Sequence, residues 1–380
     1  MIYLDNSATT KPDPDVLHSF QQVATHYFGN PSSLHSLGMD AERLLRKARE
    51  QAGGILHVNP TEIVFTSGGT EGNNLAIKGI ALAHQNRGKH IITTSVEHPS
   101  VIEACEGLKQ LGFEITYLPV DSDGRVHVKD VKNAITEKTI LVSVMHVNNE
   151  IGTIQPIQEI GQLLSDYPKI FFHVDHVQGF AKVPLNMNEA KIDLCTISGH
   201  KIHGLKGTGL LYVKHGIKLF SLAHGGGQEA DIRSGTENVP GIVGLVKAMR
   251  LANDRYYKEI DKLFDLKHYL MKALSKNRRI EINTPERESA PHIVHFSVPG
   301  FKPEVVIHAL EEKDIYISTK SACSSKSADE SQVLAACGKS YDNAASGLRV
   351  SMSFDTTAYE IDKFITELTT VLDKLSKVMG

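Results

Sequence analysis

Hydrophobic and polar positions follow two alternating periods along the first half of the chain. Short apolar runs predict strands at residues 62–66, 91–95, 114–120, 139–147 and 170–174, and helical spacing between them predicts helices at residues 71–84, 100–111, 129–135 and 157–164. This alternation indicates a mostly parallel sheet covered by helices, which is an α/β fold. Ligands of such sheets bind beyond the carboxyl ends of the strands, so polar residues in the loops there are candidates for binding and catalysis.

The pattern changes in the last third of the chain. After a long helical stretch at residues 242–276, short strands are expected at 280–282, 293–297, 315–318 and 348–353, mixed with helices at 303–312 and 359–378. This mixture predicts a second, smaller α+β domain, in keeping with a length beyond that of most single cores. We expect a large domain of residues 15–255 and a small domain of residues 256–380 that also includes residues 1–14.

Composition narrows the possible functions. The formal net charge is −3 and no long basic run is present, so direct nucleic-acid binding is not expected. We see no signal peptide and no apolar run long enough to cross a bilayer, so no membrane association is expected. The four cysteines have no Cys-x-x-Cys spacing, which favours a reducing, cytoplasmic location.

A lysine follows a predicted buried strand. Residues 198–201 (Ser-Gly-His-Lys) come after the apolar run 192–197 and before the glycine-rich segment 204–209. Desolvation there would favour the neutral amine of Lys201 and make it a nucleophile that can form a Schiff base with an aldehyde such as pyridoxal 5′-phosphate (PLP). The plain alternative is a surface lysine in a hairpin loop, which the other parts of a PLP site argue against.

Residues 67–72 (Ser-Gly-Gly-Thr-Glu-Gly) lie between a predicted strand and a predicted helix. Small residues let backbone N–H groups approach an anion, the helix N-terminus adds partial positive charge, and Thr70 adds a hydroxyl. We interpret this loop as a phosphate cradle, although an ordinary capped turn would look the same. Residues 233–236 (Arg-Ser-Gly-Thr) could add phosphate donors or simply form a turn.

Asp175 ends another predicted buried strand. A carboxylate there is suited to pair with a pyridinium nitrogen, and Gln178 could bond the phenolic oxygen of the ring. A metal site built on His173, Asp175 and His176, with His200 and His203 further along, is a rival reading. Adjacent strand residues point to opposite faces, so the metal reading is the weaker one.

Three further polar side chains follow or lie within predicted strands. His98, beside Pro99, could stack on an aromatic ligand and move protons, or it could be a helix cap. Asn149 follows Asn148 in a loop where amides could bind a hydroxyl or carboxylate, or form a turn. Arg349 lies in an apolar strand, where its fork fits a substrate carboxylate or a structural ion pair.

Cys323 has the setting of a reactive thiol. It is flanked by small and polar residues, Lys320 and Lys326 would favour its thiolate, and about 20 poorly periodic residues follow it, which suggests a mobile loop. Cys105 and Cys195 lie in apolar segments that predict inert core positions, and Cys337 is expected to pack on a helix.

These pieces together resemble the cysteine desulfurases, which are fold-type I (class V aminotransferase-like) PLP enzymes. The matching segments, which span nearly the whole chain, are residues 3–10, 65–71, 97–98, 145–152, 174–175, 198–201, 233–236 and 321–323, and Arg349. The resemblance implies a large domain with a mostly parallel seven-stranded sheet and a smaller α+β C-terminal domain. Two departures are visible: His176 replaces a small residue, and Lys320 replaces a glycine.

The resemblance implies a role for each ring contact. Lys201 is expected to be the Schiff-base lysine, and His98 to stack on the ring. Asp175 is expected to pair with the pyridinium nitrogen and Gln178 with the ring hydroxyl. The implied phosphate shell consists of Gly69, Thr70, Ser198, His200 and, from the second subunit of a homodimer, Thr236.

The resemblance also implies the reaction. Asn149, a further cofactor contact, and Arg349 are expected to bind the carboxylate of L-cysteine, and Cys323 to accept its sulfur as a persulfide while alanine leaves. The sulfur would then pass to an acceptor protein of iron–sulfur cluster assembly or tRNA thiolation. The alternatives are another fold-type I enzyme, such as a selenocysteine lyase or an aminotransferase, and the metal-dependent hydrolase on His173, Asp175 and His176.

Overall fold

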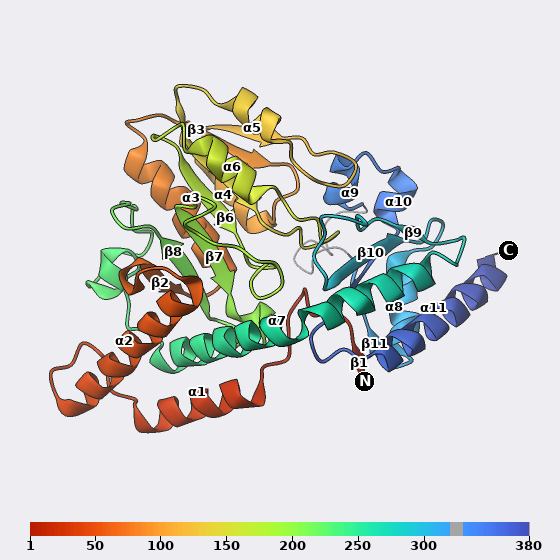
Figure 1. Ribbon diagram of the computed structural model, residues 1–380, viewed down its shortest axis with the longest axis horizontal. Coiled ribbons are helices and arrows are strands. Elements are labelled where there is room, and N and C mark those ends of the chain that lie inside the picture. Colours follow the sequence, from red (N-terminus) through yellow and green to blue (C-terminus); the bar gives the residue numbers. More distant parts are fainter. Residues whose placement is uncertain (320–329, 380) are drawn as a thin grey trace.

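The structure, a computed structural model, describes residues 1–319 and 330–379. Its largest sheet has seven strands in the order β2-β8-β7-β6-β5-β3-β4. They are β2 (Ile63–Thr66), β3 (His90–Thr94), β4 (Glu114–Leu118), β5 (Thr139–Met145), β6 (Phe171–Asp175), β7 (Leu194–Ser198) and β8 (Gly209–Val213). In this sheet β8 is antiparallel to both neighbours and the remaining pairs are parallel, so the prediction of a mostly parallel sheet is confirmed (Figure 1).

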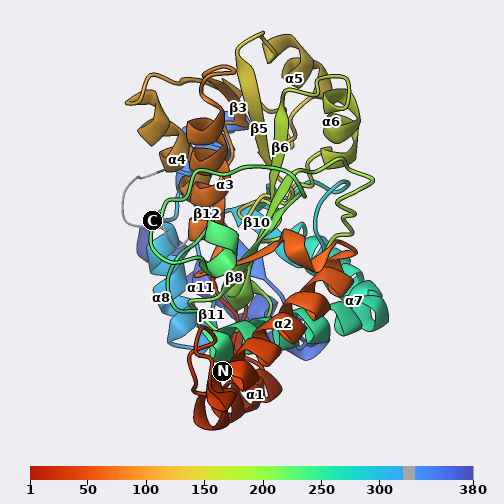
Figure 2. The same cartoon turned by 90° about the vertical axis from the view of Figure 1, so that its left-hand side faces the viewer.

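Helices cover both faces of this sheet. They are α2 (Ser36–Leu56), α3 (Gly69–His84), α4 (Pro99–Lys109), α5 (Val128–Ala134) and α6 (Ile157–Leu164), whereas α1 (Pro14–His26) packs against the long helix at residues 239–274. One apolar cluster joins the sheet to α3 and α4, and another joins it to α2 and α6. Figure 2 shows α3 and α4 on one side of the strands and α6 on the other. The strand interiors are therefore buried on both faces, which explains their uninterrupted apolar runs.

Helix α7 (Val239–Leu274) connects the two parts of the molecule. Its first half packs into the core of the large sheet through residues such as Leu245 and Met249. Its second half packs into a separate apolar cluster through residues such as Leu263 and Leu270. At 1.5 Å per residue the helix is about 54 Å long, and Figure 1 shows it passing from one half of the molecule to the other.

The second part contains a three-stranded antiparallel sheet of order β12-β10-β9. Its strands are β9 (Glu281–Ile282), β10 (Ile293–Ser297) and β12 (Gly347–Ser351), and its helices are α8 (Pro303–Glu311), α9 (Gln332–Ala336), α10 (Tyr341–Ala345) and α11 (Ala358–Met379). We expected one loop over about 20 residues after Cys323. Helices α9 and α10 occupy the end of that stretch, because Ser331 and Ser340 cap them and Leu334 and Ala344 are buried.

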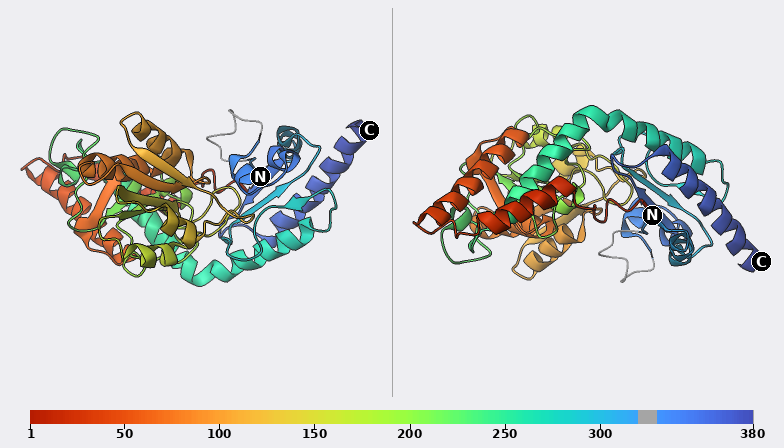
Figure 3. Two further views of the ribbon diagram at one scale, coloured as in Figure 1. Left: turned by 90° about the horizontal axis from the view of Figure 1, so that it is seen from above. Right: turned by 90° about the horizontal axis from the view of Figure 1, so that it is seen from below.

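The first residues of the chain belong to this second part. Strand β1 (Ile2–Tyr3) pairs in parallel with β11 (Ile315–Tyr316), and Leu4 is buried in the same cluster as Leu263. Figure 3 shows both ends of the chain in the half of the molecule that is coloured blue. We propose residues 15–255 as the large domain and residues 256–380 with 1–14 as the small one, which the two separate clusters support.

Candidate active site

A cavity lies at the carboxyl ends of β5, β6 and β7, next to the N-termini of α3 and α4. It collects most of the side chains that the sequence singled out. The predicted residues that line it are Gly69, Thr70, His98, Asn149, Asp175, Gln178, Ser198, His200, Lys201 and Arg349. Residues far apart in the chain thus meet where ligands of parallel sheets bind.

Lys201 reaches the cavity from a short 3₁₀ turn, Gly199–Lys201, directly after β7. Its Nζ donates to the carbonyl oxygens of Ser7, at 2.5 Å, and Ala8, at 2.9 Å. A Cβ on Gly199 would lie 2.4 Å from Thr208 Oγ1, so only glycine fits this turn. The two carbonyls were not predicted, because a backbone acceptor has no side-chain signature.

Asp175 is almost fully buried at the end of β6. Its Oδ2 accepts a hydrogen bond from Asn73 Nδ2 at 2.7 Å, and its Oδ1 accepts one from the Val177 N–H at 3.0 Å. Asn73 was missed in the sequence, although it lies four residues after Gly69 on α3 and therefore on the same helix face. Neutral donors fix this carboxylate and leave its charge to act on a cation in the cavity.

His98 is the N-cap residue of α4, and Pro99 occupies the first helical position. The Ser100 N–H donates to His98 Nδ1 at 3.1 Å, so in the neutral ring the proton resides on Nε2. Burial lowers the pKa of His98; Asp175 opposes that shift, and Lys201 adds to it. The cap and the cavity position occur together, so both readings of His98 hold: it caps the helix and it faces the ligand site.

The loop before α3 has the features of an anion site. Gly68 precedes the helix with φ 152°, and a Cβ on Gly69 would lie 2.9 Å from Val177 Cγ2. The Ser198 hydroxyl beside them is buried and has no hydrogen-bond partner among the described residues. A buried hydroxyl and the free N–H groups of a helix N-terminus both require an acceptor, and a phosphate supplies it.

His200 adds a neutral imidazole to this side of the cavity. Burial lowers its pKa to about 4, and the charges of Lys201 and Lys206 add to the shift. Its Nδ1 lies 3.2 Å from Thr9 Oγ1. The donor set of this side, a hydroxyl, an imidazole and helix N–H groups, fits the phosphate of PLP, and the Asp175 carboxylate fits its pyridinium nitrogen.

The two consecutive asparagines have different tasks. Asn148 forms a turn: its Oδ1 accepts hydrogen bonds from the N–H groups of Glu150 and Ile151. Asn149 lines the cavity, and its carbonyl oxygen accepts a hydrogen bond from Arg349 at 2.7 Å. The turn reading is therefore right for the first amide, and the second amide is the one available to a ligand.

Arg349 is 1% exposed and lies in β12 of the small domain. Its guanidinium donates to Asp5 Oδ1 at 3.1 Å and to Ser318 Oγ at 2.8 Å. The structural ion pair is therefore present, yet the side chain also lines the cavity. Its Nε has no partner among the described residues and is a remaining donor.

Glu97 was not singled out in the sequence. It is buried between β3 and β5, where its Oε1 accepts from Thr94 Oγ1 and from the Met145 N–H, each at 2.9 Å. Burial raises the pKa of this carboxyl to about 8, so it is protonated at neutral pH. It joins the strand end that carries His98 to the strand end that precedes Asn149.

Two predicted residues do not line this cavity. Thr236 is exposed and lines a separate cavity with Ser67 and Arg233. Arg233 is engaged by Glu71 in an ion pair of 2.9 Å. Cys323, with Lys320 and Lys326, lies outside the described residues.

Comparison with known proteins decides the family. The family profile described as aminotransferase class-V matches residues 2–364. A cysteine desulfurase IscS of Dictyoglomus turgidum is 42% identical over 99% of this chain and 96% of that protein, and a NifS/IcsS protein homolog of Lactobacillus delbrueckii subsp. bulgaricus is 47% identical over 100% and 99%. The chain belongs to the cysteine desulfurases of the class-V aminotransferase family.

Solved structures agree with this assignment. A NifS-like protein superimposes with a TM-score of 0.92 at 35% identity, covering 98% of this chain and 99% of that chain. SspA in complex with cysteine gives a TM-score of 0.80 at 34% identity, covering 93% and 99%. The fold-type I architecture, the dependence on PLP and the desulfurase activity expected from the resemblance are confirmed, and the aminotransferase, selenocysteine lyase and hydrolase alternatives are not favoured.

The metal reading also fails on geometry in this desulfurase. Among the described residues, no group of three or more His, Cys, Asp or Glu side chains is arranged to hold a metal ion. Asp175 faces the PLP cavity, whereas His176 faces another cavity, of about 560 Å³. His173 Nδ1 lies 2.8 Å from Ser143 Oγ, away from both. Adjacent positions thus separate Asp175 from His176, whereas His173 is unavailable because Ser143 and Thr196 occupy both of its ring nitrogens.

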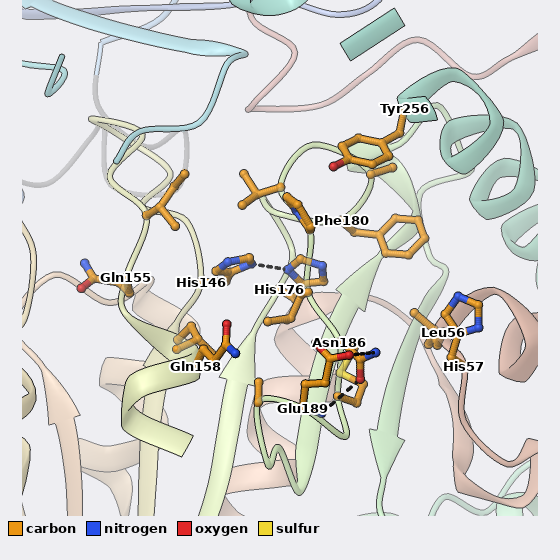
Figure 4. Close-up of a pocket in the computed structure, with 18 of the residues that line it drawn as sticks. Leu56, His57, His146, Gln155, Gln158, His176, Phe180, Asn186, Glu189 and Tyr256 are labelled. Atoms are coloured by element: carbon orange, nitrogen blue, oxygen red, sulfur yellow. Dashed lines mark hydrogen bonds between the residues drawn. The ribbon is translucent and has the colours of Figure 1, made fainter. Parts of the chain in front are cut away.

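His176 forms a histidine pair with His146. Figure 4 shows the two rings side by side, and their Nδ1 atoms are 2.9 Å apart. Burial lowers the pKa of His146 to about 4 and that of His176 well below its usual value, so both rings are neutral. A Cβ on Gly179 would lie 2.5 and 2.7 Å from the two Nδ1 atoms, so this glycine makes room for the pair.

Proposed function

We propose that this cysteine desulfurase takes the sulfur of L-cysteine onto Cys323 as a persulfide and passes it to an acceptor protein. The observation that carries the proposal is the single cavity shared by Lys201, Asp175, His98 and Arg349. It brings together a nucleophilic amine, a partner for a cationic ring, a proton carrier and a carboxylate ligand.

We assign the cofactor contacts to residues that face this cavity. Lys201 would hold PLP, Asp175 would pair with its ring nitrogen, Gln178 would approach the ring oxygen, and His98 would stack on the ring. Gly69, Thr70, Ser198 and His200 would bind the phosphate, with Asn149 as a further contact. When bound, PLP supplies an electron sink for the charge left on the substrate carbon.

The chain's own residues divide the remaining work. Arg349, with Asn149, would hold the substrate carboxylate through its remaining donor capacity. Lys201 would remove the α-proton and return a proton to carbon. His98 carries a proton on Nε2 and would exchange it with the sulfur that is transferred, since its Nδ1 is occupied by the helix cap.

The sulfur step balances without another oxidant. The Cys323 thiolate attacks the substrate sulfur, an S–S bond forms, and the C–S bond breaks with its electron pair remaining on carbon. That carbon gains a proton, and L-alanine leaves. Overall, L-cysteine and a thiol become L-alanine and a persulfide, so the acceptor receives sulfur at the oxidation level of a persulfide.

The other cysteines support the choice of Cys323. Cys105, Cys195 and Cys337 are buried. Burial raises the pKa of Cys105 and of Cys337 to about 12, and that of Cys195 well above its usual value. A buried thiol that stays protonated is a poor nucleophile, so these three cysteines are unsuited to sulfur transfer.

The test compares two cysteine variants. Cys323→Ser should bind PLP and change its absorbance on addition of cysteine, yet form no persulfide, because a hydroxyl stays protonated at neutral pH. The matched control, Cys337→Ala, should keep persulfide formation. Alanine release, persulfide labelling and the absorbance spectrum are the measurements. Persulfide formation by Cys323→Ser at the wild-type level would refute the assignment.

We also propose a homodimer in which Thr236 of one subunit completes the phosphate shell of the other. Its exposure and its absence from the lining of its own subunit's cavity support this role. Equal amounts of inactive Lys201→Ala and Thr236→Ala subunits, unfolded and refolded together, should regain about a quarter of wild-type activity, because about half of the dimers are hybrids and each hybrid has one intact site of two. Full activity of a monomer in sedimentation would contradict the proposal.

The acceptor and the location complete the proposal. We propose an acceptor in iron–sulfur cluster assembly or tRNA thiolation, and cysteine-dependent sulfur transfer to isolated candidates would identify it. The cytoplasmic location remains a prediction. None of the helices in the described ranges has an apolar stretch that could cross a bilayer.

A further inference from the structure

A second, much smaller cavity adjoins the PLP cavity. It has a volume of about 10 Å³, and Lys201 and Gln178 line both cavities. Its other lining residues include Lys182, His203 and His292. Two lysines and two histidines therefore surround a space of about one water molecule, and no Asp or Glu of the described residues is among its lining.

Lys182 is the most unusual member of this group. It is 6% exposed and makes no hydrogen bond or ion pair with any described residue. Its Nζ lies 4.7 Å from the centre of the Phe354 ring, which is a cation–π contact. A buried ammonium that is balanced only by a ring is costly, because desolvation of a charge exceeds what one cation–π contact returns.

The neighbouring charges do not neutralise Lys182. Arg255 stacks on the same Phe354 ring at 5.3 Å and engages the carboxylates of Glu259, at 3.0 Å, and Asp355, at 2.8 Å. These two carboxylates are therefore paired with a cation of their own. The ammonium is left between further positive or neutral groups.

The two histidines are neutral neighbours. His203 Nδ1 donates to the carbonyl oxygen of Lys11 at 2.9 Å, and burial lowers the pKa of this ring despite that bond. Burial also lowers the pKa of His292, with Lys182 and Lys267 adding to the shift. Neither ring supplies negative charge, so the described residues around the cavity offer Lys182 no counterion, and an external anion could take that place.

We propose that this cavity binds one monatomic anion, chloride or bromide, against Lys182. The size of the space limits the occupant to a single atom or water, and the ammonium of Lys182 favours negative charge. A water molecule would fill the space but leave the ammonium unbalanced. The site shares Lys201 and Gln178 with the cofactor cavity but uses neither of the proposed substrate contacts, Asn149 and Arg349.

The anion site has a defined pH dependence. Burial, with the nearby Arg255, lowers the pKa of Lys182 to about 8. A bound anion stabilises the protonated amine, so halide binding is accompanied by proton uptake and weakens as the pH rises above about 8. Binding should therefore be tight at pH 7 and weak at pH 9.5.

The experiment uses the PLP-bound enzyme and bromide as the probe. Crystals grown with sodium bromide should give an anomalous scattering peak beside Lys182 Nζ in the wild type. In solution, binding to the wild-type protein should broaden the chloride NMR line, and added bromide should reduce this excess broadening as it displaces chloride. The excess broadening should disappear in Lys182→Met. The matched control is Lys169→Met, an exposed lysine, which should keep the excess broadening.

Each outcome decides the proposal. An anomalous peak in the wild type that is lost in Lys182→Met supports it, and so does retention of binding in Lys182→Arg. A water-sized peak without anomalous signal in the wild type overturns it, and this measurement needs no variant to fold. Equal excess broadening in Lys182→Met and wild type also overturns it. Neither result bears on Cys323, so failure here leaves the proposed function standing.

Discussion

Asp175 and His176 are consecutive residues with opposite surroundings. Asp175 faces the PLP cavity, where Asn73 and the Val177 N–H hold its carboxylate in place. His176 faces the larger cavity on the other side of the strand end, where it pairs with His146. Two adjacent positions therefore hold a carboxylate that can act on a ligand through its charge and an imidazole that burial keeps neutral.

The contrast separates two uses of a buried polar side chain. At Asp175 the neighbours are neutral donors, so the negative charge remains available to a ligand. At His176 each ring satisfies the other, and burial keeps both uncharged. The first arrangement serves chemistry and the second joins the ends of β5 and β6, so substitutions should affect activity on one side and stability on the other.

The largest effect is expected on the chemical side, at Lys201. Lys201→Ala removes the side chain that we propose as the covalent attachment point of PLP and as the group that moves the α-proton, so alanine release should fall at least about 1,000-fold. Alanine formation under saturating PLP is the measurement. The control Lys206→Ala, at an exposed lysine in the same segment, should retain most activity. Substantial turnover by Lys201→Ala would remove it from its assigned role.

Separate substitutions of Asp175 and His176 test the comparison directly. Asp175→Asn removes the charge and should lower turnover about 100- to 1,000-fold with little change in stability. His176→Ala leaves a cavity and an unpaired His146, so it should lose about 1–3 kcal/mol of unfolding free energy with a much smaller loss of turnover. Denaturant unfolding and alanine release measure the two effects. The reverse pattern would show that the two sides are not separated.

Gly179 offers a way to disturb the histidine pair alone. Gly179→Ala places a methyl group where the two Nδ1 atoms lie 2.5 and 2.7 Å away, so the pair must separate. We expect a loss of about 1–3 kcal/mol in unfolding free energy from overpacking. The control is Gly54→Ala in helix α2, where a Cβ meets nothing within 4 Å, and it should stabilise slightly. Equal effects in both variants would argue against the pair.

The smallest effect is expected in the pH dependence of the unfolding free energy below pH 6.5. The folded-state pKa values of His146 and His176 are below those of the unfolded chain, so the unfolded state binds more protons below about pH 6.5. Stability should therefore fall as the pH drops from 6.5 toward 4. His176→Ala should reduce that slope by up to about 1.4 kcal/mol per pH unit. The control His18→Ala, at an exposed histidine, should leave the slope unchanged.

Much of the fold was predictable because its signals are local. Apolar runs located the strands of the large sheet, and the periodic helices between them lie close to their predicted bounds. The strand order could not be read from the chain, since β8 inserts between β2 and β7 through pairing over long separations. The short helices α9 and α10 were missed because five residues are too few for a periodic signal.

The candidate site also contains groups that the sequence could predict and groups that it could not. Side chains with distinctive chemistry, such as Lys201, Asp175 and Arg349, could be selected at strand ends or by family resemblance. The carbonyls of Ser7 and Ala8 could not, because they reach Lys201 only through the folded path of the N-terminal segment. Lys182 resembles many ordinary lysines in the sequence, and only its burial against an aromatic ring, without a carboxylate partner, distinguishes it.

The N-terminal segment has a consequence for synthesis on the ribosome. Asn6 bonds the carbonyl of Ser351, 345 positions away, and the next two residues hold Lys201. A nascent chain therefore cannot fix its first ten residues until β12 has left the exit tunnel. Lys201, which we propose as the reactive amine, acquires the fixed form of these neighbours only after β12 has been made, so products truncated before β12 would lack both the anchored lysine and Arg349.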